Sequence, residues 1–121
     1  MPNDDKKWMN LALLEAFRSK GSTGQNPPVG CVIVKNNIFI SSGRTSFSGR
    51  PHAEENALNK VLDKKVLLNA SIYVTLEPCS HKNINGKSCA DLIIESGISE
   101  VFISCVDPDP RTNGKSINLF K

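Results

Sequence analysis

Four residues of this chain have the types and the spacing that metal-assisted hydrolysis requires: His52, Glu54, Cys79 and Cys89. One imidazole and two thiolates are ligands that zinc prefers, and three protein ligands leave the fourth tetrahedral position open for water. Zinc lowers the pKa of a coordinated water from roughly 16 to about 7, which makes a nucleophile available at neutral pH. Glu54, two residues beyond the His, is placed to carry the proton from that water to a leaving group.

The order H-x-E followed by P-C is typical of zinc-dependent base deaminases, in which the Glu moves protons and does not bind the metal. In that pattern the second Cys follows the first after two intervening residues, whereas Cys89 comes ten residues after Cys79. We therefore expect residues 80–88 to loop out and return. Cys89 would then lie at the amino end of a helix, where the helix dipole and free amides favour a thiolate.

The elements that must position these side chains alternate between helices and strands. Apolar periodicity predicts helices over residues 4–20, 53–62 and 90–96, and strands over residues 29–34, 38–42, 71–76 and 101–105. Asn36 and Asn37 separate the first two strands and indicate a hairpin. The strand–helix–strand order after residue 50 predicts a parallel pair in a layered α/β domain. This places His52 at a helix start and Cys79 beyond the carboxyl end of a strand, where such domains carry their sites.

Composition bounds the class of protein. The chain has 121 residues and a formal charge of +3, which predicts one domain over residues 1–121. The absence of a long apolar stretch and of a signal-peptide core predicts no membrane contact and a cytoplasmic location. Scattered lysines and few aromatic residues argue against nucleic-acid binding. Cys31 and Cys105 lie in apolar runs, so we expect both to be small buried core residues rather than disulfide partners.

Structural roles compete with this chemistry. A His before a helix is often only a cap, and a Glu in a first turn often only complements the helix dipole. A closed structural zinc site is a further alternative, with His81 as the fourth ligand. The conjunction of H-A-E at a helix start, P-C after a strand and a third soft ligand favours a zinc site. Glu54 beside the His favours a catalytic one.

Four stretches also carry a family resemblance. They read N-P-P-V-G-C-V-I-V at 26–34, G-R-P-H-A-E at 49–54, Y-V-T-L-E-P-C-S-H at 73–81 and D-P-D-P at 107–110. Together they resemble the deaminase domain of the bifunctional riboflavin-biosynthesis proteins, within the cytidine-deaminase-like superfamily. The resemblance implies a three-layer α/β/α domain with a mixed central sheet, and a homo-oligomer. It also implies Zn²⁺ held by His52, Cys79 and Cys89, with Glu54 as the proton shuttle.

The same resemblance implies the substrate, a phosphoribosylated diaminopyrimidine whose 2-amino group is hydrolysed. It implies substrate contacts at Asn26, Thr45, Ala53, His81 and Asp109. Family members usually carry a His in place of Thr45 and an Asn in place of Asp109, and their loop before the last Cys is one residue shorter. The alternatives are another base (cytosine, guanine or a tRNA adenosine) and a non-catalytic, zinc-stabilised partner module. The domain is either a stand-alone protein or one part of a longer bifunctional chain.

Overall fold

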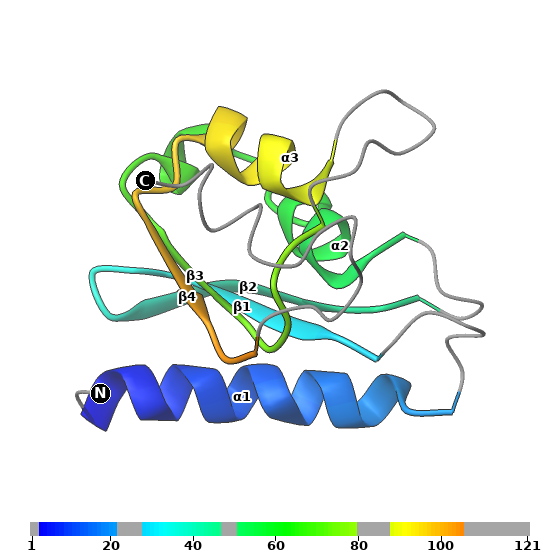
Figure 1. Cartoon of the computed structure of the whole chain (residues 1–121). Helices are drawn as coiled ribbons and strands as arrows, with labels where there is room; N and C mark the ends of the chain where they lie inside the picture. Colours follow the sequence, from blue (N-terminus) through cyan, green and yellow to red (C-terminus); the bar gives the residue numbers. More distant parts are fainter. Residues whose placement is uncertain (1–2, 22–27, 47–50, 80–87, 106–121) are drawn as a thin grey trace.

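A four-stranded sheet forms the middle layer of the protein, with strand order β2-β1-β3-β4. The structure is a computed structural model that describes residues 3–21, 28–46, 51–79 and 88–105. The strands are β1 (Gly30–Lys35), β2 (Ile38–Arg44), β3 (Ser71–Val74) and β4 (Glu100–Ile103); the helices are α1 (Asn3–Ser19), α2 (Ala53–Asn59), the short 3₁₀ helix η2 (Lys64–Leu67) and α3 (Cys89–Ser96). Figure 1 shows α1 across one face of the sheet and α2 with α3 on the other. The predicted three-layer α/β/α architecture is therefore confirmed.

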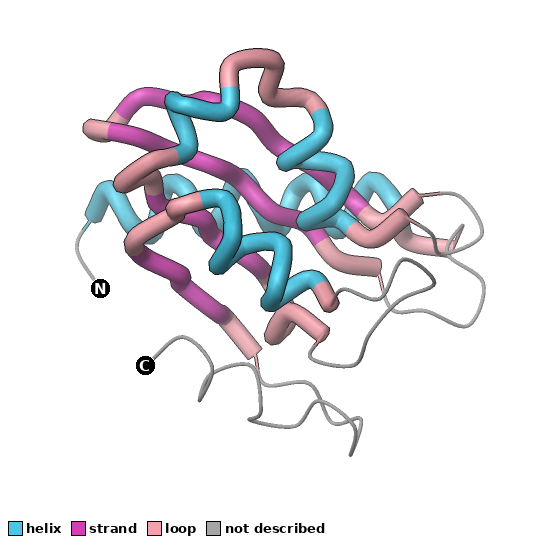
Figure 2. The backbone as a smooth tube through the Cα atoms, turned by 90° about the horizontal axis from the view of Figure 1, so that it is seen from above, coloured by secondary structure: helices cyan, strands magenta, loops and turns pink. Residues whose placement is uncertain are grey.

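The sheet is mixed, as the resemblance implied. β1 pairs antiparallel with both β2 and β3, and β3 pairs parallel with β4. The turn between β1 and β2 is made by Asn36 and Asn37, with φ of 52° and 59°, a left-handed conformation that Asn tolerates better than most residues. The predicted hairpin and the predicted parallel pair are both present. Figure 2 shows α2 and α3 side by side over the strands.

Alternation along the strands divides the core in two. Ile33, Ile72 and Val74 belong to the cluster that packs against α2 and α3, whereas Val32 and Tyr73 belong to the cluster that packs against Trp8, Met9 and Ala12 of α1. Successive strand residues point to opposite faces, so each strand serves both layers. A sheet covered on both faces gives the site elements a rigid support.

Two glycines set how closely the helices approach the sheet. A Cβ on Gly30 would lie 2.5 Å from the backbone nitrogen of Ala16 in α1, and one on Gly43 would lie 2.6 Å from the backbone nitrogen of Ala57 in α2. Real Cβ atoms do not make contacts this short, so both positions require glycine. Gly43 and Ala57 thus fix α2, and with it the helix start that carries His52.

The predicted second helix, over residues 53–62, was too long. α2 ends at Asn59, and Asp63 caps the following 3₁₀ helix by accepting a hydrogen bond from the backbone nitrogen of Lys65. Because the chain turns between these helices, Leu62 is 96% exposed instead of packing in the core. Val61 is buried, as its place in the apolar pattern predicted, so the prediction of burial fails at Leu62 and not at Val61.

The prediction for Cys105 was also wrong. Cys31 is fully buried, as expected, but Cys105 is exposed. β4 ends at Ile103, two residues earlier than predicted, and the backbone carbonyl of Cys105 accepts a hydrogen bond from the nitrogen of Glu77 at 2.8 Å. β3 likewise ends early, at Val74.

Within the described ranges, every helix is too short or too polar to cross a bilayer.

Candidate metal centre

His52 lies at the N-cap position of α2, with φ −71° and ψ 165°, and its side chain makes no capping hydrogen bond. The imidazole turns instead toward two thiols. Its Nδ1 lies 3.4 Å from the Sγ of Cys89 and 3.9 Å from the Sγ of Cys79. The capping role that competed with the chemical one is therefore not what this side chain does.

Cys89 is the first residue of α3, at the amino end where the sequence placed it. Ser88 caps this helix: its hydroxyl accepts from the nitrogen of Asp91 at 3.0 Å, and its own nitrogen donates to the Asp91 carboxylate at 3.0 Å. This capping box holds the first turn in place. Sequence reasoning missed it, although the S-x-x-D spacing of residues 88–91 is its usual signal.

Cys79 reaches the same point from the sheet. It follows β3 by five residues, and the first turn of α3 binds it twice: the Cys89 nitrogen donates to its Sγ at 3.3 Å, and the Ala90 nitrogen donates to its carbonyl at 3.1 Å. Free amides at a helix start stabilise a thiolate. The two cysteines, ten residues apart in sequence, therefore lie beside one another.

The three side chains fit a tetrahedral zinc ion. Their ligand atoms all lie within 4.8 Å of one another. Zinc–sulfur and zinc–nitrogen bonds of roughly 2.3 and 2.1 Å at tetrahedral angles place ligand atoms about 3.6–3.8 Å apart. The two His52–sulfur distances, 3.4 and 3.9 Å, bracket that value. One imidazole and two thiolates on three different segments can hold zinc and leave one position open.

The electrostatics of the thiol pair also suit a cation. The hydrogen bond from Cys89, together with contacts to His52, lowers the pKa of Cys79 to about 4. The Cys89 thiol keeps its proton, because donation to Cys79, burial and the charge of Glu54 all raise its pKa. One thiolate is thus present at neutral pH, and a metal that binds both sulfurs must displace the second proton.

Glu54 lies in the first turn of α2 and is only 3% exposed. Burial is the main reason that its pKa rises from the ordinary value of 4.5 to about 7; the charge on Cys79 adds to the rise, while its own backbone amide and His52 oppose it. Among the described residues, the metal-ligand group comprises His52 and the two cysteines without Glu54. In the metal-free protein the Glu54 carboxyl therefore exchanges its proton near pH 7.

Two of the predicted substrate contacts lie among the described residues. Thr45 is 3% exposed, and its hydroxyl accepts a hydrogen bond from the nitrogen of Val29 at 2.9 Å. Ala53 is fully buried, and its carbonyl accepts from the thiol of Cys31 at 3.4 Å. The other three, Asn26, His81 and Asp109, lie outside the described residues.

Thr75 was not singled out from the sequence. Its hydroxyl accepts a hydrogen bond from the nitrogen of Gly30 at 3.1 Å, and its nitrogen donates to the Gly30 carbonyl at 3.1 Å. These two bonds, together with the hydrogen bond that Thr45 accepts from Val29, hold the start of β1 in place. β1 is the strand that follows the segment containing Asn26. The Thr of the T-L-E-P-C stretch was the available signal.

Comparison with known proteins agrees with this geometry. Residues 2–105 match the model of the cytidine and deoxycytidylate deaminase zinc-binding region. The diaminohydroxyphosphoribosylamino-pyrimidine deaminase of Buchnera aphidicola from Acyrthosiphon pisum is 44% identical over 118 residues, which cover 96% of this chain and 74% of that protein. The riboflavin biosynthesis protein RibD of Aquifex aeolicus is 42% identical over 97% of this chain, but only 32% of its own length is covered.

A solved structure supports the fold. The deaminase/reductase of Thermotoga maritima superposes with a TM-score of 0.88 at 38% identity, covering 97% of this chain and 33% of that one. The chain thus spans about a third of the Aquifex and Thermotoga relatives and about three quarters of the Buchnera one. The chain belongs to the zinc-binding cytidine and deoxycytidylate deaminase family and, within it, to the diaminohydroxyphosphoribosylaminopyrimidine deaminases.

Proposed function

We propose that the chain is a zinc-dependent aminohydrolase that removes the 2-amino group of a phosphoribosylated diaminopyrimidine in riboflavin biosynthesis. His52, Cys79 and Cys89 would hold the ion, which supplies electrophilic activation of a water molecule when bound. Relatives that share about 40% of the sequence carry this deaminase name. Zinc fits the donor set found here, one imidazole and two neighbouring thiols.

Glu54 carries the proton chemistry in this proposal. Water adds to the carbon that bears the amine, and its proton passes to the Glu54 carboxylate. Glu54 passes that proton to the ring nitrogen, then takes the remaining proton of the newly added hydroxyl and gives it to the amine, so that the C–N bond breaks and ammonia leaves while a carbonyl forms. A carboxyl with a pKa near 7 is suited to both directions of transfer, since neither form is strongly disfavoured at neutral pH.

The observation that carries the proposal is the position of the buried Glu54 carboxyl beside the three donor side chains. Its charge raises the pKa of Cys89, and the charge of Cys79 raises its own, so the groups act on one another directly. A closed structural site has no need for a buried carboxyl that does not bind the metal. A non-catalytic partner module would have no reason to retain one.

The test is ammonia release from a panel of amino-bases by the zinc-loaded protein. We expect the highest kcat/KM for the phosphoribosylated diaminopyrimidine, compared with cytidine, guanine and a tRNA anticodon stem. Preference for guanine or the RNA by about tenfold or more would overturn the pathway assignment and leave the zinc chemistry intact. No ammonia from any member of the panel would favour the non-catalytic module.

Further properties belong to the same proposal. We propose a small-molecule phosphorylated substrate rather than nucleic acid, contacts to it from Asn26, Thr45, Ala53, His81 and Asp109, and a cytoplasmic location. We also propose that residues 1–121 act as one deaminase domain, either alone or within a longer chain, and assemble as a homo-oligomer. Sedimentation of the zinc-loaded protein measures the last property, and a monomer at micromolar concentration would contradict it.

A further inference from the structure

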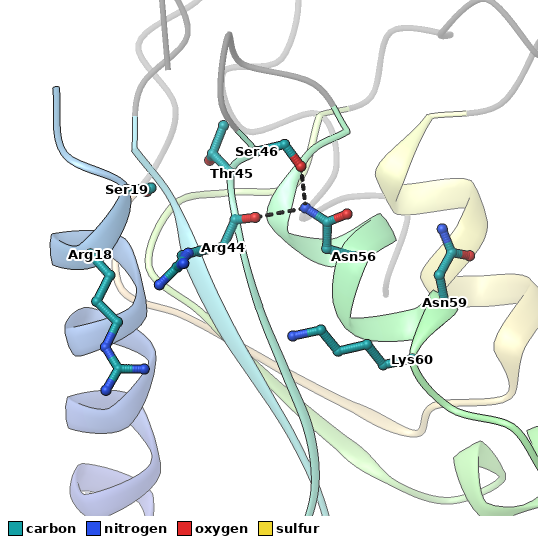
Figure 3. Close-up of a pocket in the computed structure, with 8 residues that line it drawn as sticks. All are labelled: Arg18, Ser19, Arg44, Thr45, Ser46, Asn56, Asn59 and Lys60. Carbon is teal, nitrogen blue, oxygen red and sulfur yellow. Dashed lines mark hydrogen bonds between the residues drawn. The ribbon is translucent and has the colours of Figure 1, made fainter. Parts of the chain in front are cut away.

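An open cavity of about 600 Å³ lies across the outer edge of the sheet, away from the proposed zinc ligands. It is lined by residues from the end of α1, the end of β2 and one face of α2: Arg18, Ser19, Arg44, Thr45, Ser46, Asn56, Asn59 and Lys60. Figure 3 shows Arg44 extending from β2 toward α1, and Lys60 extending from α2 toward the strand. A cavity of this size can enclose a small molecule.

The described residues that line the cavity include three basic side chains and no acidic one. Arg18 pairs with Glu15 at 3.1 Å. Within the described part of the chain, neither the Arg44 guanidinium nor the Lys60 ammonium pairs with a carboxylate. Lys60 uses one of its three donors on the carbonyl of Ser42 at 2.8 Å, which anchors the side chain along the strand. Two cations from different elements thus face one space, and no described carboxylate neutralises either of them.

The remaining lining consists of hydroxyls and amides, held in place by hydrogen bonds. The side-chain nitrogen of Asn56 donates to the carbonyl of Arg44 at 2.7 Å and to the hydroxyl of Ser46 at 2.8 Å (Figure 3). This ties α2 to the end of β2 and fixes the shape of the cavity. Asn59 and Ser46 add polar groups of the kind that bind sugar hydroxyls.

The cavity lies on the opposite side of α2 from the proposed catalytic carboxyl. Consecutive helical residues are rotated by about 100°, so Asn56 is about 200° around the helix from Glu54. Lys60, four residues after Asn56, lies on the same side as Asn56. The cavity therefore lies around α2 from Glu54, and Thr45, which lines the cavity, is also a predicted substrate contact.

We propose that this cavity binds the phosphate group of a phosphorylated sugar, with Arg44 and Lys60 as the principal cationic contacts. Guanidinium and ammonium groups from separate elements suit the several oxygens of a phosphate. The amides and hydroxyls suit the attached polyol. Two sources share this chemistry: the phosphoribosyl arm of the pyrimidine substrate, and a separate sugar phosphate.

The experiment titrates the zinc-loaded protein with ribose 5-phosphate by calorimetry and follows the side-chain amide signals of Asn56 and Asn59 by NMR. We expect saturable binding that shifts both signals. The double variant Arg44→Gln/Lys60→Gln should weaken binding by about tenfold or more, and Lys60→Arg should retain it. The matched control, Lys6→Gln/Lys65→Gln, removes the same charge from exposed positions outside the cavity and should change binding by less than about twofold.

Equal weakening by both double variants would mean that only net charge matters and would overturn the site. So would binding without shifts at Asn56 and Asn59, or no saturable binding at all.

Kinetics then distinguish the two sources. If the cavity holds the substrate's phosphate, Arg44→Gln/Lys60→Gln raises KM for the phosphoribosylated pyrimidine and leaves kcat nearly unchanged. If it holds a separate molecule, KM stays unchanged while ribose 5-phosphate binding is lost. Because binding is measured directly, the result does not depend on the proposed deamination.

Discussion

The backbone nitrogen of Cys89 donates a hydrogen bond to the Sγ of Cys79 at 3.3 Å. This single contact joins the two halves of a ligand set that the chain separates by ten residues. It is made by the first turn of α3, which Ser88 and Asp91 cap reciprocally. The fold itself therefore positions the two sulfurs, and metal binding does not have to bring them together.

Replacing Cys89 by Ser should sharply lower the zinc content, from about one ion per chain, because a neutral hydroxyl is a much poorer zinc ligand than a thiolate. Elemental analysis of the purified variant measures this. Cys105→Ser is the matched control, since that thiol is exposed and lies outside the donor set, and it should retain the parent's zinc. Full retention in Cys89→Ser would remove Cys89 from the ligand set, and His81 would become the candidate.

Glu54→Gln should keep both zinc and fold but reduce turnover by roughly two to four orders of magnitude, the usual loss when a general acid and base is removed. The amide has nearly the same shape but cannot exchange a proton. Ammonia release, elemental analysis and circular dichroism together measure the three properties. Glu55→Gln changes the neighbouring carboxylate and should stay within a few fold of the parent. Loss of zinc in Glu54→Gln would show instead that this carboxyl is structural.

The raised pKa of Glu54 also predicts how the stability of the metal-free protein depends on pH. The folded state holds the Glu54 proton up to about pH 7, whereas the unfolded chain releases it near 4.5. The folded state thus binds more protons across this window, so the free energy of unfolding falls as pH rises from about 4.5 to 7. The loss is on the order of 3 kcal/mol at most.

Urea unfolding in the presence of a chelator and a reductant measures this effect. The informative quantity is the difference between the parent and Glu54→Gln, because the ionisable groups elsewhere in the chain are common to both proteins. We expect the free energy of unfolding of the parent, relative to that of Glu54→Gln, to fall as pH increases through the window. Above the window the difference should be constant. A difference that stays flat would show that the carboxyl is not buried in its neutral form.

Much of the site was predictable because its residues occur together in one pattern, although each of them alone has common structural roles. His52 before a helix, Glu54 in its first turn and Cys79 after a strand could be placed from periodicity alone, and the structure brings the His and both cysteines together. The antiparallel pairing of β1 with β3 could not be read from periodicity. Alternation reveals which strand faces are buried but not which strands are neighbours, and the family resemblance implied only that the sheet is mixed.

The failures share a physical cause. Apolar periodicity extends through Leu62 and Cys105, but local hydrogen bonding ends each element earlier. α2 ends at Asn59 and Asp63 caps the next helix, η2, so Leu62 lies in the connection between the two helices. At the other position, the Cys105 carbonyl accepts a hydrogen bond from the nitrogen of Glu77. The basic cavity at the sheet edge was missed for a different reason. Arg44 and Lys60 are sixteen residues apart in sequence, and only the pairing of α2 with β2 brings them together.

Gly43→Ala should disturb the site from a distance. The added Cβ would lie 2.6 Å from the nitrogen of Ala57, so α2 must move away from β2, and with it the helix start that carries His52 and Glu54. Overpacking of this kind typically costs about 1–3 kcal/mol of stability. We expect a lower melting temperature and a fall in kcat, because the displaced helix start carries the groups that would move the proton. Ser42→Ala, the neighbouring change on the same strand, adds no atom against α2 and should leave both properties near the parent's. If Gly43→Ala melts like the parent and turns over at the parental rate, the close packing of α2 on β2 does not position the site.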